Sequence, residues 1–357
     1  MSASSLVVTA RLLAVSLGWC AVVSVPAIAQ SSPGVVSADS SAVHADSLRA
    51  SALLANLGLA LQGADRTTAV AAAEQDLARL DSIPGAIPQK LVGHNALQGY
   101  YSSFDIDDKL AVNARTILAL AKQLPVLIQP RATRIVSGAY RNLASLQANE
   151  LHPDSAVAIL QAAPAAFPAI PTLKDRLTPD IARYQMVGHK APPVYADYWL
   201  NRDSASPPVS WTNGVSVLVF TANWCHSCRD SYPTLTKLSA DDASRGLHMV
   251  FAVSLDGQFE GTTMPPEQEV AANRQYYVTH HGFTAPIAIQ QPASSSTTIP
   301  RNDQAFLVAA LPQLIVIDRT GTIRAVLLGW DPYGRRQHAL TTIVTQLLSS
   351  GPVAQAH

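Results

Sequence analysis

Cysteine is scarce in this 357-residue chain, which contains only Cys20, Cys225 and Cys228. Cys20 lies in an N-terminal segment with the features of a cleaved signal peptide, so the mature chain would keep two cysteines. Two cysteines three positions apart cannot form a framework of structural disulfides. This pair can react only with itself or with another molecule, which favours a redox role.

Charged residues are also scarce, because Asp, Glu, Lys and Arg make up 14% of the chain and the formal net charge is zero. The sequence has no basic run and no RNA-binding motif, so its composition gives no support for nucleic-acid binding. Apolar residues, at 48%, are ample for packed cores. A mature length of about 330 residues predicts two domains.

Residues 1–29 have the features of a secretory signal peptide. One positive charge precedes the apolar stretch 12–27, whose end carries an A-x-A cleavage signal. We expect cleavage there, a flexible leader over residues 30–41, and a periplasmic location. One alternative is an uncleaved membrane anchor facing the periplasm, because the apolar stretch is nearly long enough to span a bilayer. A less favoured alternative is lipid attachment at Cys20.

Residues 42–184 are rich in alanine and leucine at helical spacing. A pattern ending in proline occurs three times, about 40 residues apart. Its copies are Ala73, Leu77, Leu80 and Pro84; Ala114, Leu118, Ala121 and Pro125; and Ala156, Leu160, Ala163 and Pro168. The third copy resembles a tetratricopeptide (TPR) repeat in its spacings. We therefore predict three stacked helical hairpins, each copy forming the second helix of its hairpin.

The alternative for this region is an irregular helical domain, in which an alanine-rich sequence produces such spacings by chance. A concave face of stacked hairpins could bind a protein partner, or it could pack against the second domain. Prolines punctuate the end of the region, and we place the domain boundary after residue 184. The second domain then covers residues 185–350, and residues 351–357 form a tail.

The chemistry of the chain centres on Trp224-Cys225-His226-Ser227-Cys228. The preceding run, Val215–Thr221, is apolar and β-branched and predicts a buried parallel strand, whereas residues 230–240 have helical spacing. This order places Cys225 at a helix N-terminus, where the helix dipole favours a thiolate. The alternative is a metal site, but zinc normally needs four ligands and the chain has no second cysteine pair.

The cysteine pair lies in the longer motif Phe220-Thr-Ala-Asn-Trp-Cys-His-Ser-Cys228, and Pro233 follows the second cysteine by five residues. This motif resembles the active site of the thioredoxin superfamily. Residues 311–318 resemble the segment in which a cis-proline begins the strand beside the dithiol. Residues 187–192, and the β-α-β pattern between 255 and 300, resemble the exported TlpA/ResA-like branch.

The resemblance covers roughly residues 185–350. It implies an α/β thioredoxin-like fold, with a central mixed sheet flanked by helices. It also implies a thiol–disulfide oxidoreductase that needs no metal and no organic cofactor. Its redox centre would be the disulfide between Cys225 and Cys228.

The resemblance implies a role for each residue of the motif. Cys225 would be the attacking thiol on the exposed side, and Cys228 the more buried resolving thiol. His226 would stabilise the thiolate by its charge or by a hydrogen bond, although it could be an exposed turn residue of little effect. Trp224 would shield the dithiol and contact the substrate, with packing in the core as the alternative.

Other expected site residues lie outside the motif. Pro312 in the cis form would present no N–H to the sulfurs, and Leu311 would pair its backbone with an extended substrate strand. Thioredoxin has a buried aspartate six residues before its first cysteine, where this chain has Val219. Asp256 or Glu260 from the inserted segment could replace that carboxylate, although such residues more often lie in a solvated loop.

These features together imply an exported oxidoreductase that reduces disulfides of specific exported proteins, for example during cytochrome c maturation. Its electrons would come from another thiol protein, and a membrane-bound donor is one option. The His-Ser dipeptide leaves a DsbA-like oxidant or isomerase open. A protein of a different class, a partner-binding scaffold with a thioredoxin fold, is a further alternative.

Overall fold

The computed structural model describes residues 38–63, 65–103, 106–203, 209, 211, 214–294, 297–330 and 334–350. The predicted signal peptide, most of the predicted leader and the predicted tail lie outside the described residues. Within the described ranges, every helix is too short or too polar to cross a membrane.

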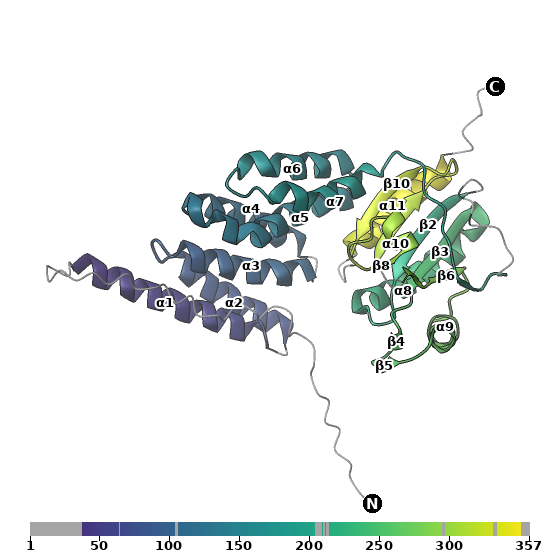
Figure 1. The fold of residues 1–357 in the computed structure, drawn as a ribbon, viewed down its shortest axis with the longest axis horizontal. Helices are drawn as coiled ribbons and strands as arrows, with labels where there is room; N and C mark the ends of the chain where they lie inside the picture. Colours follow the sequence, from purple (N-terminus) through teal and green to yellow (C-terminus); the bar gives the residue numbers. More distant parts are fainter. Residues whose placement is uncertain are drawn as a thin grey trace, which may run out of the picture. The chain divides into compact units, whose positions relative to one another are not determined.

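The N-terminal part of the described chain is built from helices (Figure 1). These are α1 (Ala38–Ala60), α2 (Arg66–Asp81), α3 (Ile87–Ser103), α4 (Asp107–Gln123), a 3-10 helix (Val126–Ala132), α5 (Thr133–Asn149), α6 (Pro153–Ala166) and α7 (Leu173–Gln185). From α2 to α7, each α-helix packs against the next one along the chain. α1 begins at Ala38, within the predicted leader.

The three copies of the sequence pattern lie on α2, α4 and α6. The first alanine of each copy, at Ala73, Ala114 and Ala156, is completely buried. Alanine at these positions lets neighbouring helices approach closely, since it has no side chain beyond Cβ. Each helix also ends two or three residues before the proline of its copy, a residue that is disfavoured in a helix interior. Assignment of these helices to the TPR type stays a prediction.

The C-terminal part has a six-stranded mixed sheet in the order β1-β6-β3-β2-β9-β10. Its strands are β1 (Tyr198–Leu200), β2 (Val215–Thr221), β3 (Leu247–Ser254), β6 (Ile287–Gln290), β9 (Gln313–Ile317) and β10 (Ile323–Leu328). β2, β3 and β6 are parallel, whereas β1, β9 and β10 each pair antiparallel. This is the central mixed sheet that the thioredoxin resemblance predicted.

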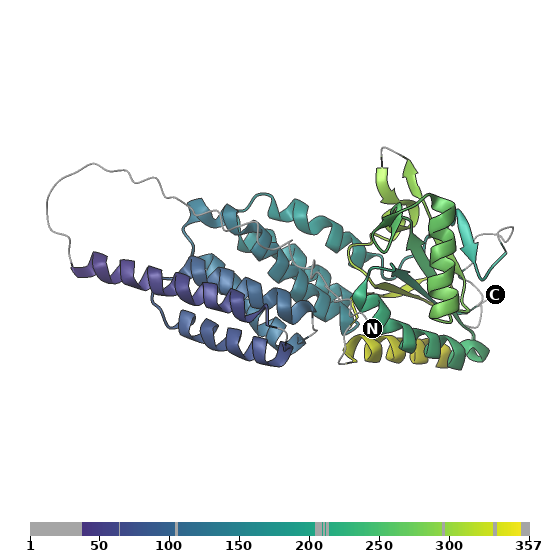
Figure 2. The same cartoon turned by 90° about the horizontal axis from the view of Figure 1, so that it is seen from below.

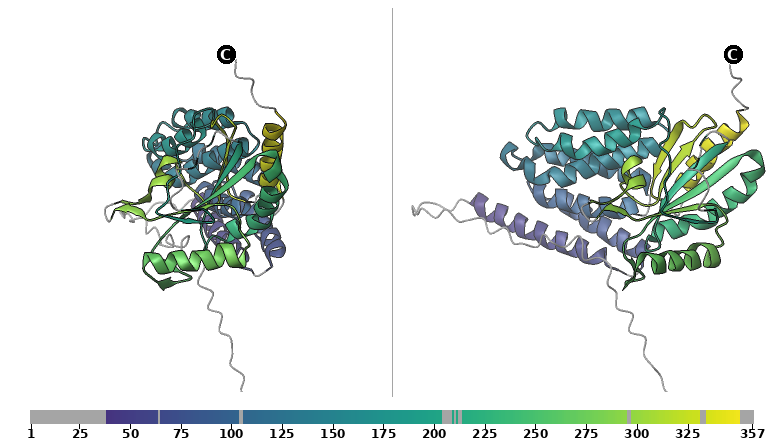
Figure 3. Two further views of the ribbon diagram at one scale, coloured as in Figure 1. Left: turned by 90° about the vertical axis from the view of Figure 1, so that its right-hand side faces the viewer. Right: turned by 45° about the vertical axis from the view of Figure 1, so that its right-hand side comes forward.

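Alternate residues of the sheet face two separate cores, as the period of two in a strand requires. On one face, Val217 and Val219 pack with α8 (His226–Asp242) and α11 (Arg335–Ser349). Figures 2 and 3 show these two helices together on one side of the sheet. On the other face, Leu218 and Phe220 pack with the segment that leads into β1 and with Phe306.

The segment between β3 and β6 contains a small hairpin and a helix. The hairpin is β4 (Gln258–Phe259) with β5 (Thr262–Thr263), and the helix is α9 (Pro266–Asn273), which continues as the π-helix Arg274–His280. Proline suits the first turn of α9 because the N–H that it lacks would have no partner there.

The Ser/Thr/Pro-rich stretch over residues 291–304 has regular secondary structure of its own. This stretch contains the hairpin β7 (Pro292–Ser294) with β8 (Thr297–Pro300), followed by α10 (Arg301–Ala305). The threonines of β8 favour an extended backbone. The two prolines are paired with each other at the open end of the hairpin, where a missing N–H is tolerated.

The helical part and the sheet part pack against each other within one compact unit, residues 46–357. α5 contacts β10, and Leu328 joins the core of the helices. Two buried arginines cross the junction. Arg336 of α11 pairs with Asp107 of α4 at 3.3 Å, and Nε of Arg183 on α7 donates to the carbonyl oxygen of Leu307 at 2.7 Å.

Candidate functional site

Cys225 is the N-cap residue of α8, and a disulfide joins it to Cys228. Its Sγ accepts a hydrogen bond from the backbone N–H of Cys228 at 3.2 Å. The first N–H groups of a helix have no partner within the helix, so they are available to a capping atom. In the reduced protein, such a bond would stabilise negative charge on the Cys225 sulfur.

Burial distinguishes the two cysteines only slightly. Cys225 is 4% exposed and Cys228 is completely buried. The expected order is therefore found, but Cys225 is far less exposed than the sequence suggested. The closed disulfide packs into the core between the sheet and α8, together with Val219 and Tyr232.

Trp224 does not pack in the core, because 65% of it is exposed. The core-packing alternative for this residue was therefore wrong. The solvent-exposed ring of Trp224 is a large apolar surface beside the cysteine pair. Such a surface offers a contact area for another molecule.

His226 is exposed, and its Nδ1 lies 2.9 Å from Nη2 of Arg229. A guanidinium group can only donate hydrogen bonds, so Nδ1 of His226 is the acceptor and carries no proton in this arrangement. The permanent positive charge in the first turn of α8 therefore belongs to Arg229. The sequence analysis missed Arg229, although a cation directly after the second cysteine was a visible signal.

A distant segment completes the surroundings of the dithiol. The Leu311–Pro312 peptide bond is cis, as the resemblance predicted, and Pro312 is buried. Ser227 donates from Oγ to the carbonyl oxygen of Leu311 at 3.3 Å. The same Oγ lies 3.6 Å from Sγ of Cys225. The fold thus brings together the predicted cysteines, Leu311 and Pro312.

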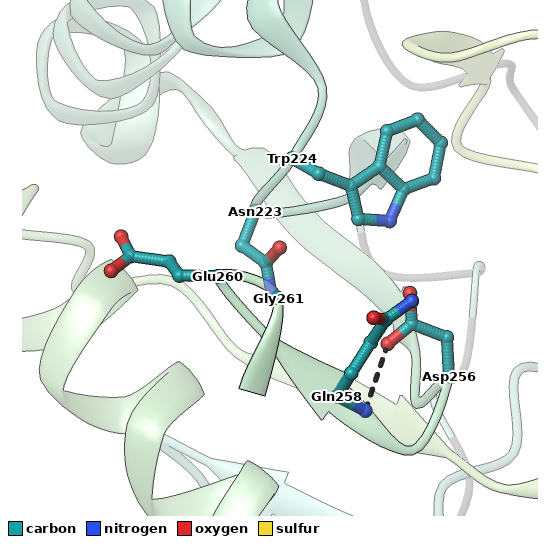
Figure 4. Close-up of a pocket in the computed structure, with 6 residues that line it drawn as sticks. All are labelled: Asn223, Trp224, Asp256, Gln258, Glu260 and Gly261. Carbon is teal, nitrogen blue, oxygen red and sulfur yellow. Dashed lines mark hydrogen bonds between the residues drawn. The ribbon is translucent and has the colours of Figure 1, made fainter. Parts of the chain in front are cut away.

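A cavity of about 290 Å³ lies next to Trp224 (Figure 4). Its lining residues are Asn223, Trp224, Asp256, Gln258, Glu260 and Gly261. Both carboxylates that the sequence offered as replacements for the thioredoxin aspartate therefore lie beside the site. Among the described contacts, neither carboxylate is hydrogen-bonded to a cysteine. A role in proton transfer stays a prediction.

Comparison with known proteins gave matches among solved structures only. No protein-family model matches the chain, and no curated protein sequence matches it. A thioredoxin-like superfamily protein is 20% identical, with a TM-score of 0.37, over 45% of this chain and 96% of its own. A thiol-disulfide isomerase from Corynebacterium glutamicum is 20% identical, with a TM-score of 0.36, over 44% of this chain and 97% of its own.

A thiol:disulfide interchange protein of the thioredoxin family from Chlorobium tepidum is similar at the same level. It is 20% identical, with a TM-score of 0.32, over 44% of this chain and 95% of its own. With TM-scores below 0.5, these similarities carry no functional argument.

Glu269 of α9 binds the backbone at Asp256, one of the residues that line the cavity. It is 1% exposed, and its two carboxylate oxygens accept hydrogen bonds from the backbone N–H groups of Asp256 and Gly257, each at 3.0 Å. Burial raises the pKa of Glu269, and the nearby Asp256 carboxylate adds to the effect, although the backbone bonds oppose it. This residue could not be recognised from the sequence, because a glutamate among exposed helix residues gives no signal of burial.

Aromatic residues pack around α8, close to the segment that contains the two cysteines. Tyr276 donates from its hydroxyl to the carbonyl oxygen of Asn223 at 3.3 Å, and Tyr232 shares a hydrogen bond of 2.8 Å with Thr221. His281 packs edge-on against Tyr232. Burial lowers the pKa of His281, and the neighbouring His280 and Arg229 lower it further. Among the described residues, no cluster of three or more His, Cys, Asp or Glu is arranged to hold a metal ion.

Proposed function

We propose that this chain is an exported thiol–disulfide oxidoreductase of the TlpA/ResA-like type. The observation that carries the proposal is the position of Cys225 at the N-cap of α8, with the Cys228 N–H directed at its sulfur. This arrangement favours a thiolate, which is the form that attacks disulfides. Export is supported by the predicted signal peptide.

The reaction transfers two electrons from the dithiol to a substrate disulfide. The Cys225 thiolate attacks one substrate sulfur, so that a mixed disulfide forms and the other substrate sulfur leaves as a thiolate. Cys228 then loses its proton and attacks Sγ of Cys225. The ring disulfide closes, and the second substrate sulfur leaves as a thiolate. A second dithiol protein restores the reduced form by the same two steps in reverse.

The substrate would be held by the surface around the dithiol. Trp224 supplies exposed apolar area, and the backbone at Leu311 lies close enough to the pair to meet an extended substrate strand. Pro312 follows Leu311 and presents no backbone N–H to the sulfurs. Extended segments of exported proteins with an accessible disulfide are therefore the expected substrates, cytochrome apoproteins among them.

The second candidate is the opposite direction, oxidation or isomerisation of exported proteins. It is favoured by the Cys228 N–H, which is directed at the Cys225 sulfur, and by the positive charge of Arg229, four positions after Cys225. Thiolate stabilisation favours the reduced dithiol and makes the disulfide a stronger oxidant.

The reduction potential of the Cys225–Cys228 pair separates the two directions. Equilibration with dithiothreitol or glutathione buffers should give about −270 mV or below for a reductase, and a value nearer about −120 mV for an oxidant. A Cys228→Ser variant should accumulate mixed disulfides with its substrates, whereas Cys225→Ser should trap none. If the pair formed no disulfide in any buffer, the redox function would be excluded.

A further inference from the structure

Arg183 of α7 connects the helical part to a loop of the sheet part. It is 3% exposed, and its Nη1 lies 2.7 Å from Oδ1 of Asp180. Its Nε donates to the carbonyl oxygen of Leu307 at 2.7 Å. The other oxygen of Asp180 accepts from Nε of Arg141 at 2.7 Å. The guanidinium of Arg183 is thus held on one edge by a carboxylate, while it binds the loop with another nitrogen.

The loop between α10 and β9 needs such support. Leu307 has a φ of +50°, which is unfavourable for a leucine because its Cβ crowds the backbone. Gln313 at the start of β9 holds the loop at two points, since its side chain donates to Phe306 O at 2.9 Å and accepts from Ala309 N at 3.3 Å. Arg183 holds it at the carbonyl oxygen of Leu307.

The far end of this loop is part of the redox site. Leu311 accepts the hydrogen bond from Ser227, whose hydroxyl contacts the Cys225 sulfur. Leu311 lies four positions after Leu307, the residue that Arg183 binds. The backbone that would meet a substrate strand is therefore fixed at one end by the helical part of the chain.

We propose that Arg183 is a positioning residue for the redox site, through the loop that it binds. The helical part then acts in the reaction by ordering the substrate-binding edge at Leu311. This inference rests on the proposed oxidoreductase function.

The chemistry of the contact favours positioning over simple packing. Burying an arginine is costly unless its charge is paired, and an apolar residue of similar size often stabilises a protein as well or better. A planar guanidinium instead fixes the orientation of the groups that it binds, because its N–H groups point in fixed directions. In this protein the N–H groups of Arg183 point to a carboxylate of α7 and to one carbonyl of a strained loop.

The test compares two disulfide probes with the reduced full-length chain. Hydroxyethyl disulfide is small and needs only the thiolate, whereas the disulfide of a short extended peptide also uses the Leu311 edge. Arg183→Met should lower the rate constant for the peptide roughly tenfold relative to that for hydroxyethyl disulfide. A tenfold loss corresponds to the free-energy cost of ordering about one loop residue when the peptide binds. The rate constant with the small probe should stay unchanged.

The matched control is Arg336→Met, which removes the other buried arginine at the same junction, the partner of Asp107 on α4. It should not change the ratio of the two rate constants. An equal loss in both variants, or an unchanged ratio in folded Arg183→Met, would overturn the proposal.

If Arg183→Met fails to fold, Arg183→Lys carries the test. Lysine keeps the charge near Asp180 but cannot span both partners with fixed geometry, so the ratio should again fall. A wild-type chain that reacts with neither probe would instead overturn the proposed oxidoreductase function, and this inference with it.

Discussion

Arg229 donates a hydrogen bond from Nη2 to Nδ1 of His226, at 2.9 Å, across the first turn of α8. The pair places a charge that does not titrate near the dithiol, since arginine stays protonated in proteins. The sequence suggested His226 as the source of positive charge, but in the structure His226 accepts a hydrogen bond. The permanent positive charge in the first turn of α8 is therefore that of Arg229, directly after Cys228 in the sequence.

We expect Arg229→Gln to make the reduction potential of the pair more negative. Loss of the charge destabilises the thiolate, hence the reduced form, by an amount typical of exposed charges, or about 10–20 mV. The measurement is equilibration with dithiothreitol or glutathione buffers at low salt, because salt screens exposed charges. Lys237→Gln removes an exposed cation farther along α8 and should leave the potential unchanged. A shift of the same size in both variants would contradict the prediction.

Alanine substitution should impair the reaction at Trp224 and the stability of the fold at Trp330. Trp224 is 65% exposed, so Trp224→Ala should change the free energy of unfolding by no more than about 0.5 kcal/mol while slowing reaction with protein disulfides. Trp330 is 5% exposed, and Trp330→Ala should lose about 3–5 kcal/mol of stability. Urea unfolding and disulfide-reduction kinetics measure the two effects. Unimpaired reduction by Trp224→Ala would remove the proposed contact role.

Glu269→Gln should destabilise the protein by about 1–3 kcal/mol, because an amide nitrogen would then face one of two backbone N–H groups. Burial raises the pKa of Glu269 above 4.5, so the folded state binds this proton more tightly than the unfolded state. The stability that this proton contributes is complete below about pH 4.5 and is lost as the pH rises through the folded-state pKa.

The advantage of wild type over Glu269→Gln should therefore shrink with rising pH in urea unfolding. Glu267→Gln, an exposed change on the same helix, is the control and should shift stability by no more than about 0.5 kcal/mol. Equal stability of wild type and Glu269→Gln at every pH would show that the two backbone bonds contribute nothing.

Ala156 and Ala158 on α6 give a matched test of the helix packing. Ala156 is completely buried, so Ala156→Leu should overfill the interface and cost about 1–3 kcal/mol. Ala158 is exposed, and Ala158→Leu should be close to neutral. Thermal or urea unfolding of the two variants measures the difference. Similar stabilities would mean that the alanine at the repeat position is not needed for close packing.

Much of the sheet could be predicted because its strands are continuous apolar runs. Val215–Thr221 was predicted with the bounds that the structure has, and β9 lies within the segment 311–318 in which the resemblance implied a strand. A run of this kind can only be buried on both faces, so few alternatives compete with it. The hairpin at residues 292–300 was missed because its strands are polar and contain proline. They therefore lack the continuous apolar pattern that marks a buried strand.

The candidate site divides in the same way. The cysteines could be predicted from spacing alone, since the three-residue separation places them on one turn of a helix. Arg183, Glu269 and Leu307 could not, because each acts through contacts with residues distant in the sequence. The exposure of Trp224 was equally hidden, since an aromatic side chain fits a core or a contact surface.

The sequence by itself determined that two cysteines lie three positions apart at the start of a helix, and that helical spacing gives way along the chain to strand and helix patterns. These follow from local spacing and periodicity, which act over a few residues. Only the tertiary structure decided which charge lies by the dithiol, how deeply Cys225 is buried, and which helix holds the Leu311 loop. Those properties depend on distances between segments that the chain brings together only when it folds.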